Sequence, residues 1–526
     1  MNNLHIKFDD ANCFKYGNLV IKFKGLVFYK NYMCGVDSLK HFFYDYSKYI
    51  DNVKYLRGNF VLCICDKSST YVFTDNSGMS RLYYYKDLVF DKYLELIDYF
   101  KLSSSDLDSS GVVEYIQYGY SIFFTLFKDV KILGREDMIC INGKMLTIQK
   151  KLVGDIFDKG EDIVEFYNNF KYNFKDMKIA CDLTAGIDSR LNVALLKNSK
   201  INFKTSISGQ PNHIDVMKCK EISKILNIGV LQFELDKNID KSITDKLFYQ
   251  LDGQYSILEF YKNYILTMGL IDKKINLRIS GAGGEMYKYS WFAEDFPRFN
   301  KKKFTLDKVY KKRFFSRSVK YDFYTDNFVK KIDNYQEEVK DMLEKYRCIN
   351  NSKTYDKICY ETIMRFGAST QMIQFDDNYV RYAPLLELSV VRNGVNLSVK
   401  DRLLYMYHRR LITKSCADIA NVKTNKGLSV GSSVFSIGMD ALKLFGEFIV
   451  KIKNKIFRIN VNKTDNANSD KIYEFVRKND ADLIKIIKKY DIVDDSFDNT
   501  KVDNQTYSRL ITIAKMIDYI DNKYEK

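Results

Sequence analysis

The stretch 178–197 reads KIACDLTAGIDSRLNVALLK and joins three kinds of local sequence. It begins with an apolar run typical of a buried strand, continues with a loop of small and hydroxyl residues around Gly186, and ends with the apolar spacing of a helix. The same alternation recurs in FKTSIS at 203–208, a helical pattern from about 215 to 226, GVLQFEL at 229–235, and INLRIS at 275–280 before a second glycine cluster. Repeated strand, loop and helix predict a parallel α/β sheet.

The sequence on either side of this region has a different period. Residues 1–155 read as short strands separated by turn signals, with strand patterns at 19–23, 26–29, 60–65, 71–74 and 82–85. A helical period begins near Ile163, and the pattern after residue 300 is mostly helical. We therefore predict a fold class of α/β plus α+β. A β-rich sandwich at 1–155 would precede a parallel-sheet α/β domain with a helical C-terminal part at 156–526.

Composition limits the class of protein. With 526 residues, of which 46% are hydrophobic, the chain can bury a sizeable core, which excludes a wholly disordered chain and a small disulfide scaffold. The formal net charge of +16 points to an anionic partner without saying which one. The 10 cysteines lack zinc-type spacing, and neither a signal peptide nor an apolar run of about 18 residues is recognisable. We expect a cytoplasmic protein that is not inserted in a membrane.

The loop from Leu183 to Ser189 lies where the amides at a helix N-terminus can hold phosphate groups. It lacks the Gly-Lys-Ser/Thr of a Walker A loop and the GxGxxG of dinucleotide sites. An ordinary turn, in which Asp188 and Ser189 cap the helix, explains the loop by itself about equally well. The loop alone leaves both interpretations open.

The loop resembles the SGGxDS pyrophosphate-binding loop of the N-type ATP pyrophosphatases, in the form found in the asparagine synthetase family. Thr184, Gly186, Asp188 and Ser189 match the motif, and Ala185 stands where the motif has its first glycine. If that position needed a positive φ, alanine would strain the loop. This loop and the two segments described next supply the residues that the resemblance assigns to nucleotide binding. They are Leu183, Thr184, Gly186, Ile187, Asp188, Ser189, Ser206, Ile207, Gly281 and Gly283.

Two further segments resemble that family in the same order. SISGQPNHIDVMKCKEISKILNI at 206–228 resembles the strand end that cradles adenine and the helix after it. LRISGAGGEMYKYSW at 277–291 resembles the LSGxGxDE segment, with Glu285 at the magnesium-binding acidic position. The resemblance implies ATP and Mg²⁺ as cofactors, with the metal held by Asp188 and Glu285. Cleavage of ATP between its α and β phosphates requires such acids, hydroxyls and amides to converge at strand ends.

The segment DDNYVRYAPLLELSVVRNGVNLS at 376–398 resembles the family's EaRvPFLD segment, with Arg381 and Pro384 in place. Tyr379 stands where the family has a glutamate that acts on the amine or the adenylate, so another residue would have to take that role. The candidates are Asp376, Asp377 and the neighbouring pair Tyr360 and Glu361.

The segment IANVKTNKGLSVGSS at 419–433 resembles the basic loop of amide-forming relatives. In those relatives a lysine stabilises the transition state or the departing pyrophosphate; Lys426 is the better match here and Lys423 is the alternative. Because the chain has 83 Lys and Arg residues, a lysine in a surface loop is also expected by chance. We predict Lys426, Glu361 and Tyr360 as the catalytic residues.

The segment LRGNFVLCICDKSSTYVFTDNSGMSRLYYY at 56–85 resembles the core of the class II glutaminase domain, which implies an Ntn-hydrolase-like fold for the N-terminal unit. An active domain of that kind uses an N-terminal cysteine whose α-amine serves as its base. This sequence begins MNN, and its first cysteine is Cys13. Cys63 and Cys65 would share one face of a strand, as packing thiols do. The resemblance therefore implies a glutaminase-like domain that lacks its nucleophile.

Together these resemblances predict an ATP-dependent, carbon–nitrogen bond forming ligase similar to the β-lactam synthetases. A carboxylate would be adenylated with release of pyrophosphate, and an amine of a small-molecule or peptide substrate would displace AMP without glutamine hydrolysis. One alternative is a pseudoenzyme or interaction module, favoured by Ala185 and Tyr379. Another is an RNA-modifying ATP pyrophosphatase, favoured by the basic stretches 301–318 and 451–458. The acidic residues at 333–344 weigh against nucleic-acid binding, and a homodimer is compatible with the sequence.

Overall fold

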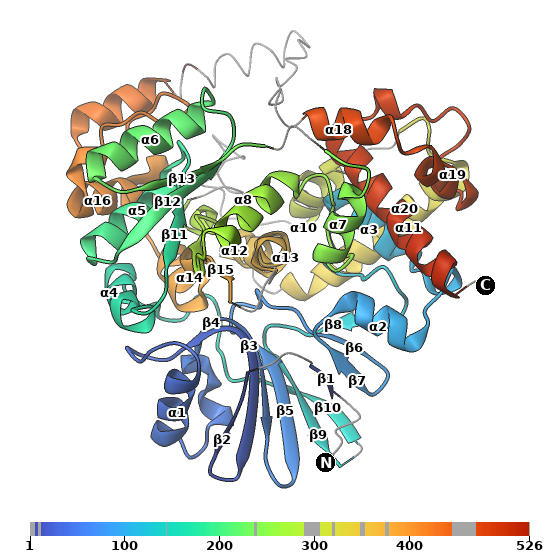
Figure 1. Cartoon of the computed structure of the whole chain (residues 1–526), viewed down its shortest axis with the longest axis horizontal. Coiled ribbons are helices and arrows are strands. Elements are labelled where there is room, and N and C mark those ends of the chain that lie inside the picture. Colours follow the sequence, from blue (N-terminus) through green and yellow to red (C-terminus); the bar gives the residue numbers. More distant parts are fainter. Residues whose placement is uncertain are drawn as a thin grey trace.

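The computed structural model of the chain describes residues 6–8, 12–143, 145–235, 239–288, 306–317, 321–347, 353–373, 378–443, 446 and 470–524. Its N-terminal strands form a larger and a smaller sheet (Figure 1). The larger sheet contains β2 Asn12–Tyr16, β3 Leu19–Phe28, β4 Arg57–Cys65, β5 Ser69–Thr74, β9 Asp137–Asn142 and β10 Met145–Lys150. The smaller one contains β1 Ile6–Lys7, β6 Tyr83–Tyr85, β7 Leu88–Phe90 and β8 Lys131–Ile132. The larger sheet is antiparallel in the order β10-β9-β5-β4-β3-β2, and the smaller has the order β1-β7-β6-β8.

Alternating side chains of β4 hold these sheets together. Val61 and Cys63 pack with Leu82 and Val89 between the sheets, and Cys65 packs against the same cluster. The alternate positions of β4 join a second core with helix α1 (Val36–Asp45). The predicted β-rich N-terminal unit is therefore present, and Cys63 and Cys65 share one face of the strand.

The second sheet is parallel throughout, as the alternation of strand and helix predicts. Its strands are β11 Ile179–Asp182, β12 Phe203–Ser208, β13 Val230–Phe233, β14 Leu277–Ile279 and β15 Val380–Tyr382. They lie in the order β13-β12-β11-β14-β15, so the chain leaves β11 and β14 toward opposite edges of the sheet. Neighbouring strands with this relation form a topological switch point, the place where open α/β sheets bind ligands.

Helices cover both faces of this sheet. Helix α5 (Ile187–Asn198) and helix α6 (Ile214–Leu226) share an apolar core with Ile179 and Cys181 of β11. Helix α8 (Tyr261–Asp272) packs on the opposite face of the sheet, against Ala180. Helix α6 begins and ends within one residue of the predicted helix. Helices α4 Ile163–Asn173, α14 Leu388–Val395, α15 Val399–Arg402 and α16 Met406–Ser415 complete this side of the molecule.

The remaining helices form a third region beside the parallel sheet (Figure 1). They are α2 Tyr93–Phe100, α3 Ser109–Tyr118, α7 Ile243–Gln250, α10 Leu306–Val309, α11 Asp326–Leu343, α12 Lys353–Cys359, α13 Arg365–Ser369, α18 Asp470–Arg477, α19 Ala481–Lys489 and α20 Asn504–Tyr524. Their largest apolar cluster joins α2 and α3 to α11 and α20, so it draws on both sides of residue 155. No helix among the described residues is long and apolar enough to cross a membrane.

Candidate active site

The loop between β11 and α5 is closed by its own hydroxyl groups. Ser189 Oγ accepts a hydrogen bond from the Thr184 N–H at 3.1 Å, and Thr184 Oγ1 accepts one from the Gly186 N–H at 3.1 Å. The Ala185 N–H donates to Asp215 Oδ1 at 2.9 Å, which ties the loop to α6. Ala185 is buried and is not among the residues with positive φ, so alanine in place of the motif's glycine causes no backbone strain of that kind.

The loop after β14 packs directly against the loop after β11. A Cβ atom on Gly281 would lie 2.9 Å from the Ser189 nitrogen, and one on Gly284 would lie 2.2 Å from the Asp188 carboxyl group. Gly283 has a φ of 96°, in the left-handed region that favours glycine. The structure thus brings two of the predicted segments, nearly 100 residues apart in sequence, into contact at the switch point.

Asp188 lies between two basic side chains. Lys288 Nζ donates a hydrogen bond to Asp188 Oδ2 at 2.5 Å, and the buried His408 on α16 places Nε2 3.2 Å from Oδ1. Burial opposes the ionisation of Asp188, but the charge of Lys288 and the contact with His408 outweigh it and lower the carboxyl pKa. The pKa of Lys288 is raised, because the charges of Asp188 and Glu285 outweigh its burial. The carboxylates of both predicted magnesium ligands therefore stabilise the charged form of the Lys288 ammonium group.

The same contacts bear on magnesium binding. Asp188 and Glu285 offer the hard oxygen atoms that Mg²⁺ prefers, and a magnesium ion on phosphate oxygens needs only one or two carboxylates. Among the described residues, no group of three or more His, Cys, Asp and Glu side chains is gathered as a metal site would be. The donor set fits Mg²⁺ shared with phosphates, provided that the Lys288 ammonium moves off Asp188.

A cluster of buried charges lies on the ends of the central strands. Arg278 Nε donates to Asp182 Oδ1 and Oδ2 at 2.8 and 3.0 Å. Arg381, the register partner of Arg278 on β15, places Nη2 3.6 Å from Asp182 Oδ2 and donates to Ser280 Oγ at 3.3 Å. Burial and the neighbouring Arg278 lower the pKa of Arg381 to about 9. Two guanidinium groups therefore share one carboxylate.

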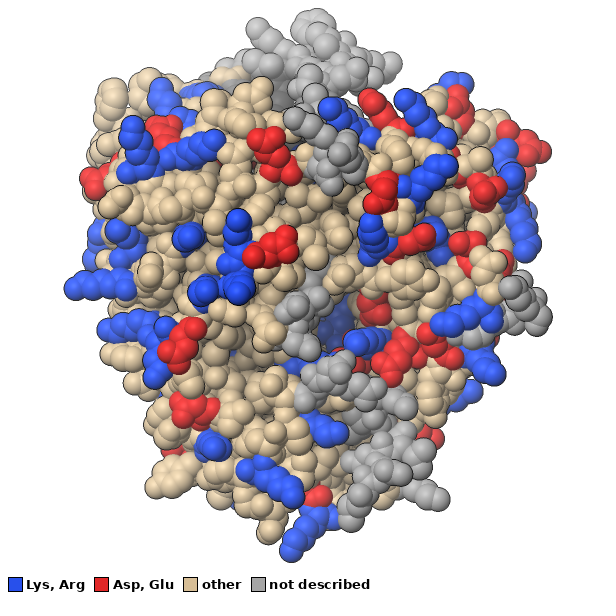
Figure 2. All heavy atoms as spheres, viewed as in Figure 1, with Lys and Arg blue, Asp and Glu red and all other residues tan. Residues whose placement is uncertain are grey.

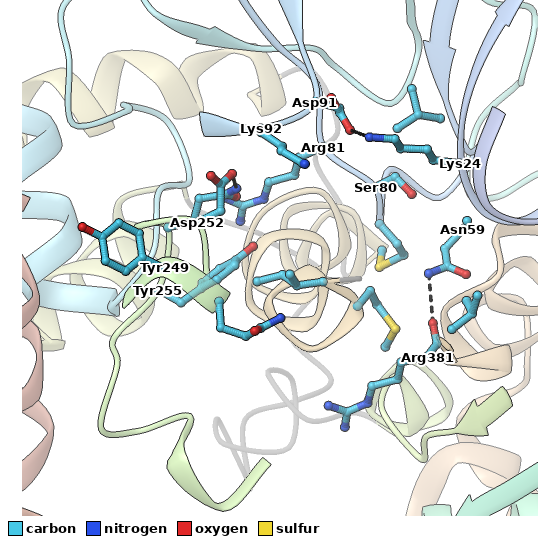
Figure 3. Close-up of a pocket in the computed structure, with 18 of the residues that line it drawn as sticks. Lys24, Asn59, Ser80, Arg81, Asp91, Lys92, Tyr249, Asp252, Tyr255 and Arg381 are labelled. Carbon is cyan, nitrogen blue, oxygen red and sulfur yellow. Dashed lines mark hydrogen bonds and ion pairs between the residues drawn. The ribbon is translucent and has the colours of Figure 1, made fainter. Parts of the chain in front are cut away.

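Two cavities open beside this cluster. The sheet-end cavity, of about 500 Å³, lies at the C-terminal ends of β11 and β12, where Asp182, Thr184, Ser206, Ile207 and Ser208 line it. The interface cavity, of about 770 Å³, lies between the N-terminal sheets and the residues around α7, and Figure 3 shows Lys24, Asn59, Arg81, Asp91 and Asp252 on its walls. Tyr255 and Arg381 line both cavities, so the two adjoin.

The predicted basic loop lies close to α5 but outside both cavities. Arg190, within α5, donates to the carbonyl oxygen atoms of Ile419 and Val422, which fixes the start of that loop. Lys423 and Lys426 are exposed, and neither is among the residues that line the two cavities. The role predicted for Lys426 stays a prediction.

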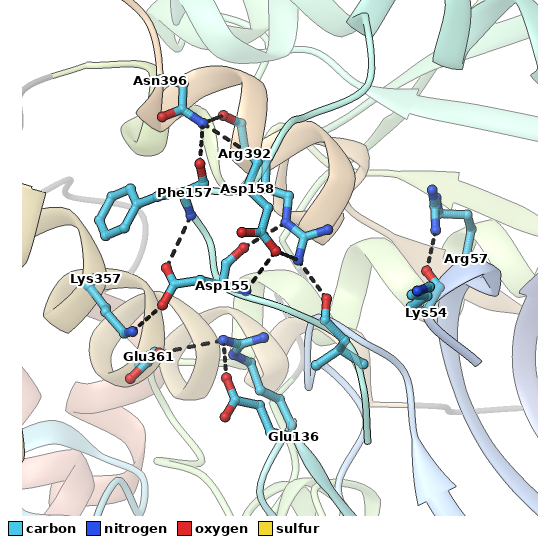
Figure 4. A network of polar contacts seen from close by, with 12 residues as sticks. Lys54, Arg57, Glu136, Asp155, Phe157, Asp158, Lys357, Glu361, Arg392 and Asn396 are labelled. Atoms are coloured by element: carbon cyan, nitrogen blue, oxygen red, sulfur yellow. Dashed lines mark hydrogen bonds and ion pairs between the residues drawn. The ribbon is translucent and has the colours of Figure 1, made fainter. Parts of the chain in front are cut away.

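Tyr360 and Glu361 lie in a different environment from the one that a catalytic role suggests. The fully buried Tyr360 donates its hydroxyl hydrogen to Leu386 O at 3.3 Å. Glu361 accepts a hydrogen bond from Tyr346 at 2.6 Å and lies 3.5 Å from Arg135, within a network that joins residues 135–158 to 357–396 (Figure 4). Neither is among the residues that line the two cavities, and the catalytic roles predicted for them stay predictions.

Tyr379 is buried in an apolar cluster with residues of α8, and it interacts electrostatically with Arg278 and Arg381. The other candidates for the missing glutamate, Asp376 and Asp377, lie outside the described residues. So do 451–458 and, within the basic stretch 301–318, residues 301–305 and 318. On the face shown in Figure 2, Lys and Arg are interspersed with Asp and Glu.

The sequence-based site omitted four polar side chains that the structure places at its centre: Asp182, Arg278, Lys288 and His408. A signal for two of them was available, because Asp182 and Arg278 interrupt otherwise apolar strands, and a charge there is expected to be paired. Lys288 and His408 carried no such signal, since their contacts with Asp188 depend on distant elements.

Comparisons with known proteins give little beyond this geometry. No protein-family model and no curated protein matches the sequence. Among 23 matching chains of solved structures are the glutamine phosphoribosylpyrophosphate amidotransferase from B. subtilis complexed with ADP and GMP, and a second described as the allosteric regulatory enzyme of purine biosynthesis. Identity is 11% and 10%, over 44% of this chain and 50% and 49% of theirs, with a TM-score of 0.19 each. The matched region spans about half of those chains, and likeness at this level carries no argument about activity.

Proposed function

We propose that this chain is an ATP-dependent ligase that adenylates a carboxylate and transfers the acyl group to an amine. One arrangement supports this above all. At the switch point of a parallel sheet, the hydroxyl-rich loop at the N-terminus of α5 contacts the glycine loop after β14, beside the sheet-end cavity. Open α/β sheets bind ligands in such a crevice, and helix N-termini bind phosphate groups.

In the first step a carboxylate oxygen would attack the α-phosphorus of ATP, and the bond from that phosphorus to the bridging oxygen would break to release pyrophosphate. The hydroxyl groups of Thr184 and Ser189 and the amides of the loop would donate to the leaving phosphates. For that, the Ala185 N–H has to exchange Asp215 for a phosphate oxygen. Magnesium held by Asp188 and Glu285 would supply further positive charge.

In the second step the nitrogen of an amine would attack the acyl carbon, and AMP would leave. The amine loses one proton in this step. The groups lining the sheet-end cavity that can accept this proton include Asp215 and His213. Two further carboxylates on its walls are ion-paired, Asp182 with Arg278 and Glu259 with Arg509. We further propose that the amine belongs to the substrate, so glutamine should yield no glutamate in the presence of the enzyme and ATP.

The decisive measurement is pyrophosphate release with ATP, Mg²⁺ and a panel of carboxylates, together with ATP-dependent thermal stabilisation. Asp188→Asn should lower pyrophosphate release by about a hundredfold or more, because it removes one of the two carboxylates proposed to hold the magnesium ion that neutralises the developing pyrophosphate. Asp482→Asn is the matched control, since Asp482 is exposed on α19. A wild-type chain that is not stabilised by ATP and Mg²⁺ and releases no pyrophosphate would overturn the proposal.

The alternative is an interaction module that keeps the fold without ATP chemistry. It is favoured by the contacts that already engage the site, because Asp215 accepts from the Ala185 amide and Lys288 lies on Asp188. The same thermal-shift measurement separates the two, since the module predicts no stabilisation by ATP at any Mg²⁺ concentration.

A further inference from the structure

The interface cavity is rich in basic side chains. Its lining includes Lys24, Arg81, Lys92, Lys246 and Arg381 against Asp91 and Asp252. Lys24 forms an ion pair with Asp91 at 2.7 Å, and Lys246 forms one with Asp240 at 2.8 Å. Arg381 contacts Asp182, whereas Arg81 forms no ion pair with another described residue.

Arg81 is held in place by aromatic rings and neutral acceptors. Its guanidinium group donates to the carbonyl oxygen of Phe366 and to Ser369 Oγ, both at 3.2 Å. The same group lies 4.9 Å from the centre of the Tyr255 ring and 5.4 Å from that of Phe366. These contacts fix the side chain and stabilise a cation, but they supply no formal negative charge. An anion in the cavity would supply it.

Arg381 stands at the junction of the two cavities. It shares the carboxylate of Asp182 with Arg278, which makes the shorter contacts to it. Its backbone carbonyl accepts a hydrogen bond from Asn59 at 2.9 Å, so the N-terminal unit and β15 are tied together at this point. Figure 3 shows Arg81 coming from the N-terminal unit and Arg381 from the side of β15.

On the basis of the proposed function, we infer that the interface cavity binds the carboxylate substrate, and that this substrate is a peptide-sized molecule with two anionic groups. The reactive carboxylate lies near Arg381, next to the nucleotide, and the second anionic group binds Arg81. A cavity of about 770 Å³ suits a molecule of several residues rather than a single amino acid. The N-terminal unit thereby takes part in substrate recognition through Arg81.

The test uses two probes that differ by one charge at the end remote from the C-terminal carboxylate. Succinyl-Ala-Ala-Ala has a carboxylate at each end, and acetyl-Ala-Ala-Ala has one. We expect isothermal titration calorimetry to show that the full chain binds the succinyl peptide about tenfold more tightly, the size of effect that one charge-assisted hydrogen bond gives. Arg81→Gln should abolish this preference, and Arg81→Lys should retain part of it because the charge remains.

Arg347→Gln is the matched control, because Arg347 is exposed and paired with Glu344, and it should keep the full preference. Circular dichroism and the unfolding temperature establish that each variant is folded. If Arg81→Gln does not fold, the comparison of wild type with Arg81→Lys decides. Equal affinities of the wild type for both peptides would overturn the inference. So would an undiminished preference in Arg81→Gln, which loses the charge, or in Arg81→Lys, which loses the planar guanidinium group. A wild type that prefers the succinyl peptide, but is not stabilised by ATP and Mg²⁺ and releases no pyrophosphate with any carboxylate of the panel, contradicts the proposed function alone.

Discussion

The two adjoining cavities differ in how their charges are balanced. The sheet-end cavity is lined by the carboxylates of Asp182, Asp215 and Glu259 and by the basic groups of Lys262, Arg278 and Arg381. The interface cavity has five basic side chains and two acidic ones. The difference between the cavities rests on Arg81. Lys24 is paired with Asp91, Lys246 with Asp240, and Arg381 contacts Asp182, whereas Arg81 is held by aromatic rings and neutral acceptors. We therefore propose the nucleotide for the first cavity and an acidic substrate for the second.

The largest expected effect tests the balance of the sheet-end cavity. Arg278→Met leaves the partly buried Asp182 without its closest partner and removes the hydrogen bonds from Arg278 to Asn263 and Thr267. We expect the free energy of unfolding to fall by about 3–5 kcal/mol, measured by denaturant titration. Arg347→Met, which breaks an exposed pair, should leave the free energy of unfolding nearly unchanged. A similar loss in both variants would show that the buried pair is not special.

The next effect concerns a residue outside both cavities. If the basic loop acts on the departing pyrophosphate, Lys426→Ala should lower pyrophosphate release by about a hundredfold, since it removes a charge that acts in the transition state. Lys423→Ala tests the alternative lysine of the same loop, and a large loss there instead would transfer the role to Lys423. Lys485→Ala, on the surface of α19, is the matched control and should change the rate by less than about threefold. Unchanged release in both Lys426→Ala and Lys423→Ala would confine the chemistry to the cavities.

A smaller effect tests the competition between Lys288 and magnesium for Asp188. Lys288→Ala frees Asp188 Oδ2, so we expect the Mg²⁺ concentration for half-maximal ATP-dependent stabilisation to fall by about tenfold, equivalent to about 1.4 kcal/mol. Lys485→Ala, on the surface of α19, should leave that concentration unchanged. The same Mg²⁺ dependence in Lys288→Ala and wild type would show that the ammonium group and the metal do not compete.

The smallest effect depends on pH and belongs to the interface cavity. Burial raises the pKa of Asp252 to about 6, although its carboxylate accepts hydrogen bonds from the Tyr93 and Leu94 amides. The carboxyl group therefore becomes negative as the pH rises from 5.5 to 7.5, which should weaken succinyl-peptide binding by about threefold. Because the folded pKa lies above the ordinary 3.8, ionisation also costs stability, and the free energy of unfolding should fall as the pH rises through roughly 4 to 6.

Asp252→Asn should flatten both pH profiles, whereas Asp482→Asn, on the exposed surface of α19, should keep them. Calorimetric titrations and denaturant curves at several pH values make this comparison. A profile that keeps its slope in Asp252→Asn would assign the titration to another group.

Periodicity was sufficient to predict much of the fold. The strand pattern at 203–208 coincides with β12, and those at 19–23 and 26–29 merge into the single strand β3. The sequence did not reveal α2 and α3 within the N-terminal unit, because short apolar runs suit a strand and a helix equally well. They are helices in a structure where their apolar faces pack with α11 and α20, which lie more than 200 residues further along the chain.

The sequence by itself determined the alternation of strands and helices and the glycine loops at the ends of β11 and β14. Whether alanine at position 185 strains its loop was decided by the backbone, in which Ala185 does not have a positive φ. Only the tertiary structure decided which charges meet. Asp182 and Arg278 pair across 96 positions, and Asp188 meets Lys288 and His408, because strand register and helix packing bring distant side chains within a few ångströms. The preference of a segment for helix or strand is encoded within a few neighbouring residues, whereas the pairing of charged side chains depends on the order and register of the strands.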